Sequence, residues 1–518
     1  MLKRLLWGLI VLAAFAIAIW KFQASPSQSQ PPAMSSKLAI LYNAEEQPGE
    51  KTVLAQLIQA QLKKAGMEVS LEPVPSTVYN DRVGKGEFDI VLSLWYLDYN
   101  DAEGYLTDFY SKAGYRLSRY SNSAYDEAYL SALFSSTEAQ KLTRYAAVAK
   151  IIDDAKPWIP LFSNNEIFLM SPAAQGFQSN AFQYYDYRQV ELPAIRTATD
   201  TEVQTLDPAQ TYDLASKHIV TQSYEGLIAM DGNDRIVPAL AKSWTVSPNA
   251  DAITFDLRPG VHFHPAAFLG TQLRTLTSAD VKATFERLIK ANSPYGYIFD
   301  HVAGVQAFKD GQVKGVEGFV ADAPLRFTIK LTKPLQTMLP WLLAPAAYIL
   351  PADLPEKYDF SKESCGTGPF VLTGWDGAQA TFKANAGYWA RSQDGRALPR
   401  AKLLTIRVVK DPNVQLLALK QGQLDIINVS LPLLDTLLDA DGKLKSNWSQ
   451  YSLREVKLNN LKFLGFNMQS THGVASLPLR QGIDSALDKQ AIVAQLLHGK
   501  ARAARSVVPA EMLAAPQP

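Results

Sequence analysis

The fold is decided by residues 37–71, which read KLAILYNAEEQPGEKTVLAQLIQAQLKKAGMEVSL. The opening KLAILY is a short apolar run typical of a buried strand. Residues 52–65 carry apolar side chains at helical spacing, and Gly66 follows them as a common helix terminator. The closing MEVSL at 67–71 is again typical of a strand. The order strand, helix, strand predicts a parallel α/β sheet.

The same alternation continues up to residue 162. A short helix is expected around 79–83, and FDIVLSL at 88–94 has the composition of a further strand. A longer helix is expected over 137–154, with a threonine cap at its start and Pro157 after its end. WIPLF at 158–162 then predicts a strand that returns to the core.

The pattern changes near Leu192. Strand candidates such as ITFDL at 253–257 and FTIKL at 327–331 alternate irregularly with helices, which predicts an α+β arrangement for this part. Helix starts are indicated by the threonine and aspartate of TSAD at 277–280 and by LDKQ at 487–490.

The N-terminus has the layout of an export signal. A basic start, MLKR, precedes an apolar run from Leu5 to Trp20, and Lys21 follows it. Cleavage after Ala24 would place the bulky Phe22 three residues before the cut, so we interpret residues 1–22 as an uncleaved anchor. Residues 23–36 are rich in Pro, Ser and Gln and are expected to be a linker. The chain is therefore expected to be periplasmic and tethered to the inner membrane, with a cleaved signal and a soluble periplasmic protein as the alternative.

Composition excludes several classes of function. The 518 residues carry 51 Lys and Arg against 50 Asp and Glu, so no overall field attracts a polyanion and no nucleic-acid partner is expected. A hydrophobic fraction of 47% is enough for a large core. The single cysteine, Cys365, excludes an internal disulfide and any zinc site that needs two thiolates.

Three motifs that could carry chemistry have a simpler explanation. His262 and His264 are two residues apart, but no third metal ligand is near them in the sequence, and a structural role is favoured. Cys365 has no local partner that marks a nucleophile. The GTGPF turn at 366–370 lacks the Lys-Ser/Thr of a phosphate-binding loop. We therefore expect neither an enzyme nor a metal or other cofactor.

The segment WYLDYND, residues 95–101, is the best candidate for a binding site. It follows an apolar strand directly, and the carboxyl ends of strands are where α/β sheets usually hold ligands. Aromatic side chains give apolar walls, and a carboxylate beside them can pair with a ligand ammonium. Asp98 is the strongest single candidate for that carboxylate.

Many motifs of the chain resemble those of the bacterial extracellular solute-binding proteins of family 5, which serve peptide, nickel and related ABC importers. They are TDTEVQTLDPAQ from Thr199, YEGLI from Tyr224, IVPALAKSWTVS from Ile236, FDLRPGVHFH from Phe255, LTSADV from Leu276, GTGPF from Gly366, NAGYWA from Asn385, ALKQGQLDI from Ala418, LGFN from Leu464 and LRQGIDSALDKQAIV from Leu479.

The order of the motifs predicts a circular permutation. Three segments at the front of this chain resemble the last third of the family's sequences. They are LAILYNAEE, FDIVLSLWYLDYND and RYAAVAKIIDDAKPWIPLF. The family's usual ends would be joined between Val190 and Pro193. We expect residues 37–190 to correspond to the family's C-terminal third, 191–460 to its N-terminal lobe and 461–518 to the remainder of the second lobe.

The resemblance implies a two-lobed clamshell with a hinge, of the periplasmic binding protein type II, cluster C, closing around a ligand. Asp98 would match the aspartate that pairs with the α-ammonium of a peptide, and Trp95 a pocket wall. Two strands that hydrogen-bond the peptide backbone in the family would be matched here by Leu94, Trp95 and Tyr96 and by Glu202, Val203 and Gln204.

One position departs from the oligopeptide-binding pattern. Leu92 stands where such proteins can carry an arginine for the ligand's carboxylate, so Arg82 or Lys85 would have to replace it, or the ligand is not a free peptide.

The expected function is that of a monomeric solute-binding component that delivers short peptides to an ABC permease in the inner membrane. One alternative is a membrane-anchored ligand sensor or interaction protein with the same fold. The other is a binder of a non-peptide solute such as a nickel chelate or a sugar.

Overall fold

The computed structural model describes residues 38–46, 49–97, 99–114, 116–270, 273–291, 293–430, 433–439 and 442–514. The expected anchor at 1–22 and linker at 23–36 lie outside these residues, and so does Asp98. In the described part of the chain, no helix combines the length and the hydropathy needed to cross a membrane.

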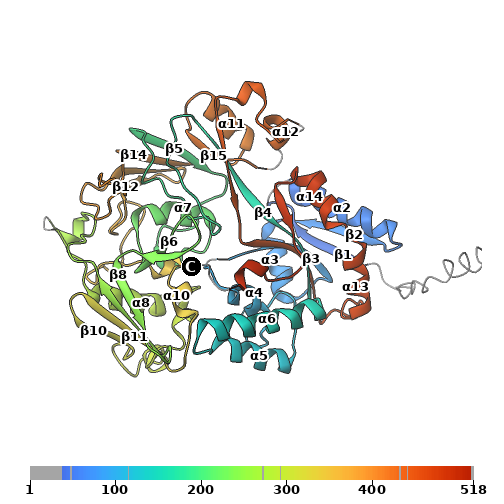
Figure 1. Ribbon diagram of the computed structural model, residues 1–518, viewed down its shortest axis with the longest axis horizontal. Helices are drawn as coiled ribbons and strands as arrows, with labels where there is room; N and C mark the ends of the chain where they lie inside the picture. Colours follow the sequence, from blue (N-terminus) through green and yellow to red (C-terminus); the bar gives the residue numbers. More distant parts are fainter. Residues whose placement is uncertain are drawn as a thin grey trace, which may run out of the picture.

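A twelve-stranded mixed sheet organises the molecule (Figure 1). Ten strands follow one another in the order β12-β13-β14-β5-β15-β4-β17-β3-β1-β2, and β16 and β18 also pair with β4. A four-stranded antiparallel sheet, β10-β11-β9-β8, and the β6–β7 pair complete the strands.

The first lobe is built from both ends of the described chain. Its strands are β1 (Leu38–Asn43), β2 (Val69–Val74), β3 (Ile90–Tyr96), β17 (Asn460–Phe466) and β18 (Ala501–Ala503). Its helices are α2 (Glu50–Lys64), α3 (Ser76–Lys85), α4 (Glu103–Leu106), α5 (Ser123–Leu133), α6 (Glu138–Ala155), α13 (Leu477–Ala486) and α14 (Lys489–Leu497).

The second lobe comprises the segment between β4 and β17. Its strands are β5 (Ala194–Thr199), β6 (Ile228–Met230), β7 (Ile236–Pro238), β8 (Ala241–Val246), β9 (Ala252–Leu257), β10 (Phe319–Ala323), β11 (Arg326–Lys330), β12 (Phe370–Trp375), β13 (Gln379–Ala384), β14 (Leu403–Val408), β15 (Ile426–Asn428) and β16 (Ser452–Lys457). Its helices are α7 (Leu214–Ser223), α8 (Ser278–Lys290), α9 (Val305–Lys309), α10 (Met338–Trp341), α11 (Pro412–Lys420) and α12 (Leu434–Leu437).

The two lobes are joined through β4 (Trp158–Met170), the long strand between the two bodies in Figure 1. The first part of β4 pairs with β17 and β18, and its last part pairs with β15 and β16. The chain crosses again between β16 and β17, through Leu458 and Asn459. Two adjacent crossings of this kind are the geometry of a hinge.

The lobes also touch away from the hinge. Thr337 Oγ1 lies 3.4 Å from the Tyr145 hydroxyl, and Gln336 donates to the carbonyl of Ser136 at 2.8 Å. A large apolar core cluster includes buried side chains from both lobes, such as Tyr145 and Phe285. Figure 1 shows α5 and α6 of the first lobe lying next to α10 of the second.

Several expected elements are present with shifted ends. The predicted strand, helix and strand over 37–71 are β1, α2 and β2, joined in parallel by the β1–β2 register. Thr277 and Asp280 form a capping box at the start of α8, and Thr137 caps α6, as the sequence predicts. The strand expected over 158–162 continues to Met170, so the sequence-based prediction of its end was wrong.

Candidate functional site

We call the carboxyl-end side of β1, β2 and β3 the crevice, after the place where α/β sheets usually hold ligands. β1 pairs in parallel with β2 on one side and with β3 on the other, so the chain runs from β1 to β2 and then crosses back past β1 to reach β3. Ligands bind α/β sheets at such a switch point. Asn43 shapes the edge of the crevice, because its Oδ1 accepts bonds from the backbone N–H groups of Glu45 (3.0 Å) and Glu46 (3.3 Å).

β3 extends past its neighbour at this crevice. Its pairing with β1 ends at the Tyr42–Leu92 register position, whereas its pairing with β17 continues to Tyr96. Within the described residues, no strand therefore pairs with the β1-side edge of Leu94–Tyr96. An exposed strand edge offers backbone N–H and C=O groups to an extended ligand.

Tyr96 is the last residue of β3 at that edge. It keeps 42% of its surface accessible, yet loss of solvation is the largest cause that raises its pKa well above the usual value. The carboxylates of Glu46, Glu50, Glu166 and Asp200 raise it further. Because Asp200 directly follows β5, the second lobe contributes negative charge to the crevice as well.

Two of these carboxylates have buried cationic partners. Glu50 pairs with Lys462, and Glu46 pairs with Lys51. Lys462 is fully buried, whereas Glu46 keeps part of its surface accessible. Both pairs hold the start of α2 against the end of the sheet, since Glu50 and Lys51 are the first residues of that helix.

Among the described residues, Glu166 on β4 accepts hydrogen bonds from neutral donors only. It accepts bonds from the Tyr185 hydroxyl, from Gln183 (3.0 Å), from Ser179 (3.3 Å) and from Asn428 (2.8 Å). Its exposed fraction is 3%, and burial raises its pKa to about 7. The carboxyl therefore changes charge near neutral pH.

The expected site residues on β3 divide between the two faces of the sheet. Trp95 packs toward the core: its Nε1 donates to the Gly104 carbonyl at 2.8 Å, and its ring centroid lies 5.5 Å from that of Trp158. Leu94 is half-buried beside the open edge. Asp98 falls outside the described residues, and its two neighbours in the sequence, Leu97 and Tyr99, are buried.

The other expected residues have partners of their own. Glu202 is exposed and pairs with Lys410 at 2.5 Å, Val203 is half-buried, and the backbone N–H of Gln204 donates to Ser216 Oγ at 3.0 Å. These three residues are not part of a strand.

Arg82 lies on α3, where its Nη2 pairs with Glu72 at 2.8 Å and its Nε donates to the Glu87 carbonyl at 3.0 Å. Lys85 pairs with Asp81 at 2.8 Å. Among the described residues, no hydrogen bond or ion pair joins either cation to β3.

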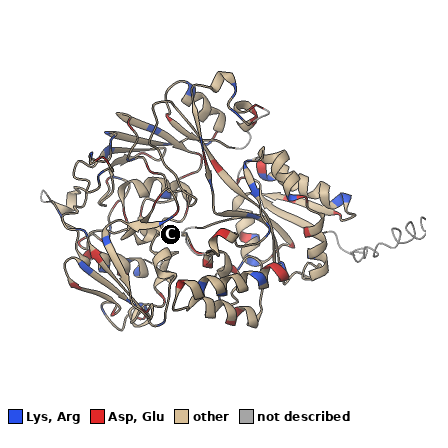
Figure 2. Ribbon diagram, viewed as in Figure 1, with Lys and Arg blue, Asp and Glu red and all other residues tan. Residues whose placement is uncertain are grey.

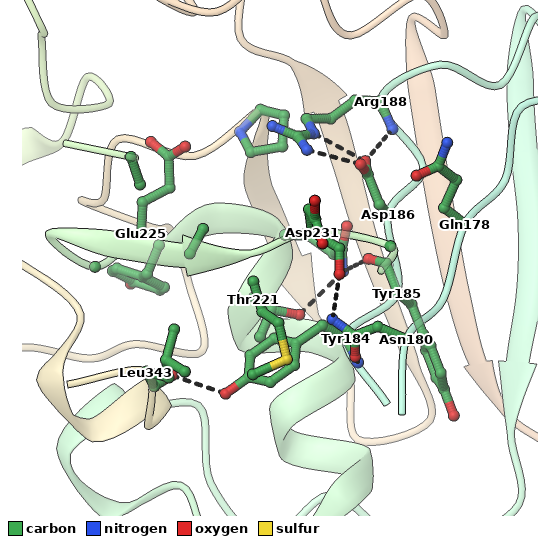
Figure 3. Close-up of a pocket in the computed structure, with 18 of the residues that line it drawn as sticks. Gln178, Asn180, Tyr184, Tyr185, Asp186, Arg188, Thr221, Glu225, Asp231 and Leu343 are labelled. Atoms are coloured by element: carbon green, nitrogen blue, oxygen red, sulfur yellow. Dashed lines mark hydrogen bonds and ion pairs between the residues drawn. The ribbon is translucent and has the colours of Figure 1, made fainter. Parts of the chain in front are cut away.

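A separate pocket lies wholly in the second lobe (Figure 3). It has a volume of about 200 Å³ and is formed by the segment after β4, the end of α7, the β6 strand with its turn, and Leu343, Tyr348 and Tyr388. Sequence reasoning assigned no role to these residues.

The described residues contain no group of three or more His, Cys, Asp or Glu that could hold a metal ion. His264 is instead buried between Ser364 and Gly368.

Two α/β lobes joined through β4 and the β16–β17 connection are the architecture expected of a two-lobed binding protein. A sequence profile of the bacterial extracellular solute-binding proteins, family 5 (middle region), matches residues 21–116 and 235–518, more than half of the chain. The chain belongs to this family. The profile matches in its ordinary order, so the match does not show a circular permutation.

Named relatives resemble parts of the chain. Protein XP55 of Streptomyces lividans is 29% identical over 318 residues, which are 60% of this chain and 51% of that protein. The dipeptide-binding protein of Escherichia coli is 26% identical over 329 residues, or 60% and 56% of the two chains. NikZ of Campylobacter jejuni, solved with Ni(L-His), is 22% identical with a TM-score of 0.44, covering 59% and 56%. The chain thus spans about half the length of the curated relatives it matches.

Proposed function

We propose that the protein binds short peptides in the periplasm and delivers them to an ABC permease. The observation that carries this proposal is the open edge of Leu94–Tyr96 at the switch point of the sheet. A peptide backbone can pair with such an edge whatever its side chains are, whereas a compact solute uses little of it. The name of the Escherichia coli relative, a dipeptide-binding protein, agrees with this ligand class.

The charge of the crevice supports a ligand with a free amino end. Glu166 and Asp200 act electrostatically on Tyr96, and neither has a cationic partner among the described residues. In our proposal Asp98 pairs with the peptide ammonium, and Asp200, together with the ionised form of Glu166, adds to the negative potential that attracts it. Glu202, Val203 and Gln204 line the opposite side of the bound peptide.

Isothermal titration calorimetry tests the ligand class. Di- and tripeptides with a free amino end should bind, and their N-acetylated counterparts should bind at least about tenfold more weakly, since the charge pair is lost. Equal affinities for both forms would show that the protein does not recognise the peptide ammonium. Binding of a nickel chelate or a sugar in place of peptides would show that the ligand belongs to that class.

We also propose that the chain is circularly permuted and that its N-terminal 22 residues anchor it to the inner membrane. The permutation is supported by the motif order and by the first lobe, which is built from residues 38–170 and 460–514 together. An engineered chain opened between Val190 and Pro193, with residues 514 and 38 joined by linkers of several lengths, should fold and bind the same ligand. Failure at every linker length would contradict the permutation.

A further inference from the structure

The pocket of the second lobe differs from the crevice in position and in chemistry. Its walls come from residues 178–189, 221–232, 239, 343–348, 369 and 388, none of which belongs to the first lobe. Its volume of about 200 Å³ is below the roughly 300 to 1,000 Å³ of pockets that take drug-sized ligands. That space suits a molecule of a few heavy atoms and is too small for a peptide of several residues.

The charged side chains on the wall are linked to one another. Arg188 binds Asp186 through two parallel bonds, Nε to Oδ1 at 2.9 Å and Nη2 to Oδ2 at 2.7 Å. Its Nη1 lies 3.4 Å from the Tyr388 hydroxyl, which donates to Glu225 at 2.7 Å. The Arg188 guanidinium is thus bonded directly to Asp186 and is linked to Glu225 through the Tyr388 hydroxyl.

Asp231 adds a third carboxylate to the wall. Its Oδ1 accepts the backbone N–H groups of Asn233 (2.8 Å) and Arg235 (2.9 Å), which closes the turn after β6. In the part of the chain that the structure describes, nothing bonds its Oδ2. Three carboxylates and one guanidinium leave an excess of negative charge among the lining residues.

Neutral groups on the wall also suit a cation. The amide oxygen of Gln178 lies beside the same turn, only 3.1 Å from where a Cβ on Gly232 would stand. Three tyrosines, Tyr184, Tyr348 and Tyr388, supply ring surface, and tyrosine faces attract ammonium groups. Lys217 already lies over the Tyr184 ring, with Nζ 4.1 Å from its centroid. In Figure 3, Asp231 lies between the Arg188–Asp186 pair and the Tyr184 ring.

We propose that this pocket is a second ligand site, for a small organic amine whose ammonium group bonds Asp231 Oδ2 and Gln178 Oε1. The uncharged part of the amine packs against the tyrosine rings. Arg188 and Glu225 take no direct part, since each is already bonded within the wall. The site is independent of peptide binding and does not rest on the proposed function.

The test compares two aspartates that close turns in the same way. Asp231→Asn removes the charge and keeps an oxygen that can accept the two backbone bonds. Asp376→Asn is the matched control, because Asp376 accepts the N–H groups of Ala378 (2.9 Å) and Gln379 (2.7 Å) in an exposed turn. The probes are n-propylammonium and ethanolammonium chloride, titrated by calorimetry and by NMR into the full chain.

The wild type and the Asp376→Asn variant should bind the amines saturably, and Asp231→Asn should lose at least about tenfold in affinity. Gln178→Leu should weaken binding to a smaller extent, because it removes a neutral acceptor. Saturation with amine should leave peptide affinity unchanged. Absence of saturable binding to the wild type, or equal affinity for Asp231→Asn, would overturn the proposal.

Discussion

Trp341 Nε1 lies 3.2 Å from the Glu103 carboxylate, and this hydrogen bond joins the two lobes at a buried position. Glu103 is 2% exposed and also accepts the hydroxyls of Tyr99 and Tyr129, each at 2.6 Å. Tyr99 and Tyr129 belong to the same lobe as Glu103, so among the described residues only Trp341 bonds this carboxylate from the second lobe. Separation of the two lobes at this position would break that bond.

Replacing Trp341 with Phe should therefore favour the open form. The lost bond to a charged acceptor is worth about 1.5 to 3 kcal/mol, enough to shift a two-state equilibrium by at least about tenfold. Small-angle scattering of the ligand-free protein should show a larger radius of gyration. Trp389→Phe is the matched control, because Trp389 Nε1 donates to Glu225 at 3.0 Å within one lobe. Identical scattering of wild type, variant and control would show that the Trp341–Glu103 hydrogen bond does not hold the lobes together.

Glu166 should make stability depend on pH. Its pKa in the folded protein is about 7, above the ordinary 4.5, so the folded state holds a proton that the unfolded state releases between these values. The protonated Glu166 carboxyl therefore contributes to the free energy of unfolding fully below pH 4.5, and this contribution is lost as the pH rises through 7. Relative to wild type, Glu166→Gln should gain about 2.5 kcal/mol between pH 5 and pH 8 in denaturant unfolding. A difference that does not vary with pH would contradict the raised pKa.

The Lys462–Glu50 pair should contribute strongly to folding. Lys462 has no accessible surface, so Lys462→Met leaves a buried carboxylate without this cation and should cost about 3 to 5 kcal/mol. Adding Glu50→Gln should recover much of that loss. The exposed Lys85–Asp81 pair is the control, and Lys85→Met should change the free energy of unfolding by less than about 1 kcal/mol. Equal effects of the two lysine substitutions would contradict this account.

Asp98→Asn tests the expected charge pair with the ligand. It should weaken binding of peptides with a free amino end by about 2 kcal/mol or more and leave N-acetylated peptides unaffected. Calorimetry on both ligand sets measures this difference. A variant that binds free peptides as tightly as wild type would show that another group holds the ammonium.

Much of the fold could be predicted from local pattern. The apolar runs around β1 and β3 and the capping residues of α6 and α8 reflect short-range preferences that a sequence displays directly. The end of β4 could not be predicted in this way. The strand continues through the polar SNNE at 163–166, because pairing with β16 and β18 supplies backbone bonds there. Tertiary pairing therefore overrode local polarity.

The candidate site was predicted less completely. The position of Leu94–Tyr96 at the end of a strand follows from the sequence, since these residues come directly after an apolar run. Glu166 and Lys462 were missed because their partners are remote: Asn428 is 262 residues from Glu166, and Glu50 is 412 residues from Lys462. For Lys462 the available indication was a charged residue inside an apolar strand pattern, whereas Glu166 stands in the polar SNNE and had no such indication.

Mass spectrometry of the small molecules released on denaturing the purified protein tests the central claim most directly. The account predicts short peptides with free α-amino ends, bound along the edge of Leu94–Tyr96. Their amount should fall in Asp98→Asn and stay unchanged in Asp376→Asn. Release of a nickel chelate, a sugar or another non-peptide solute, with no peptide present, would contradict the peptide-binding function.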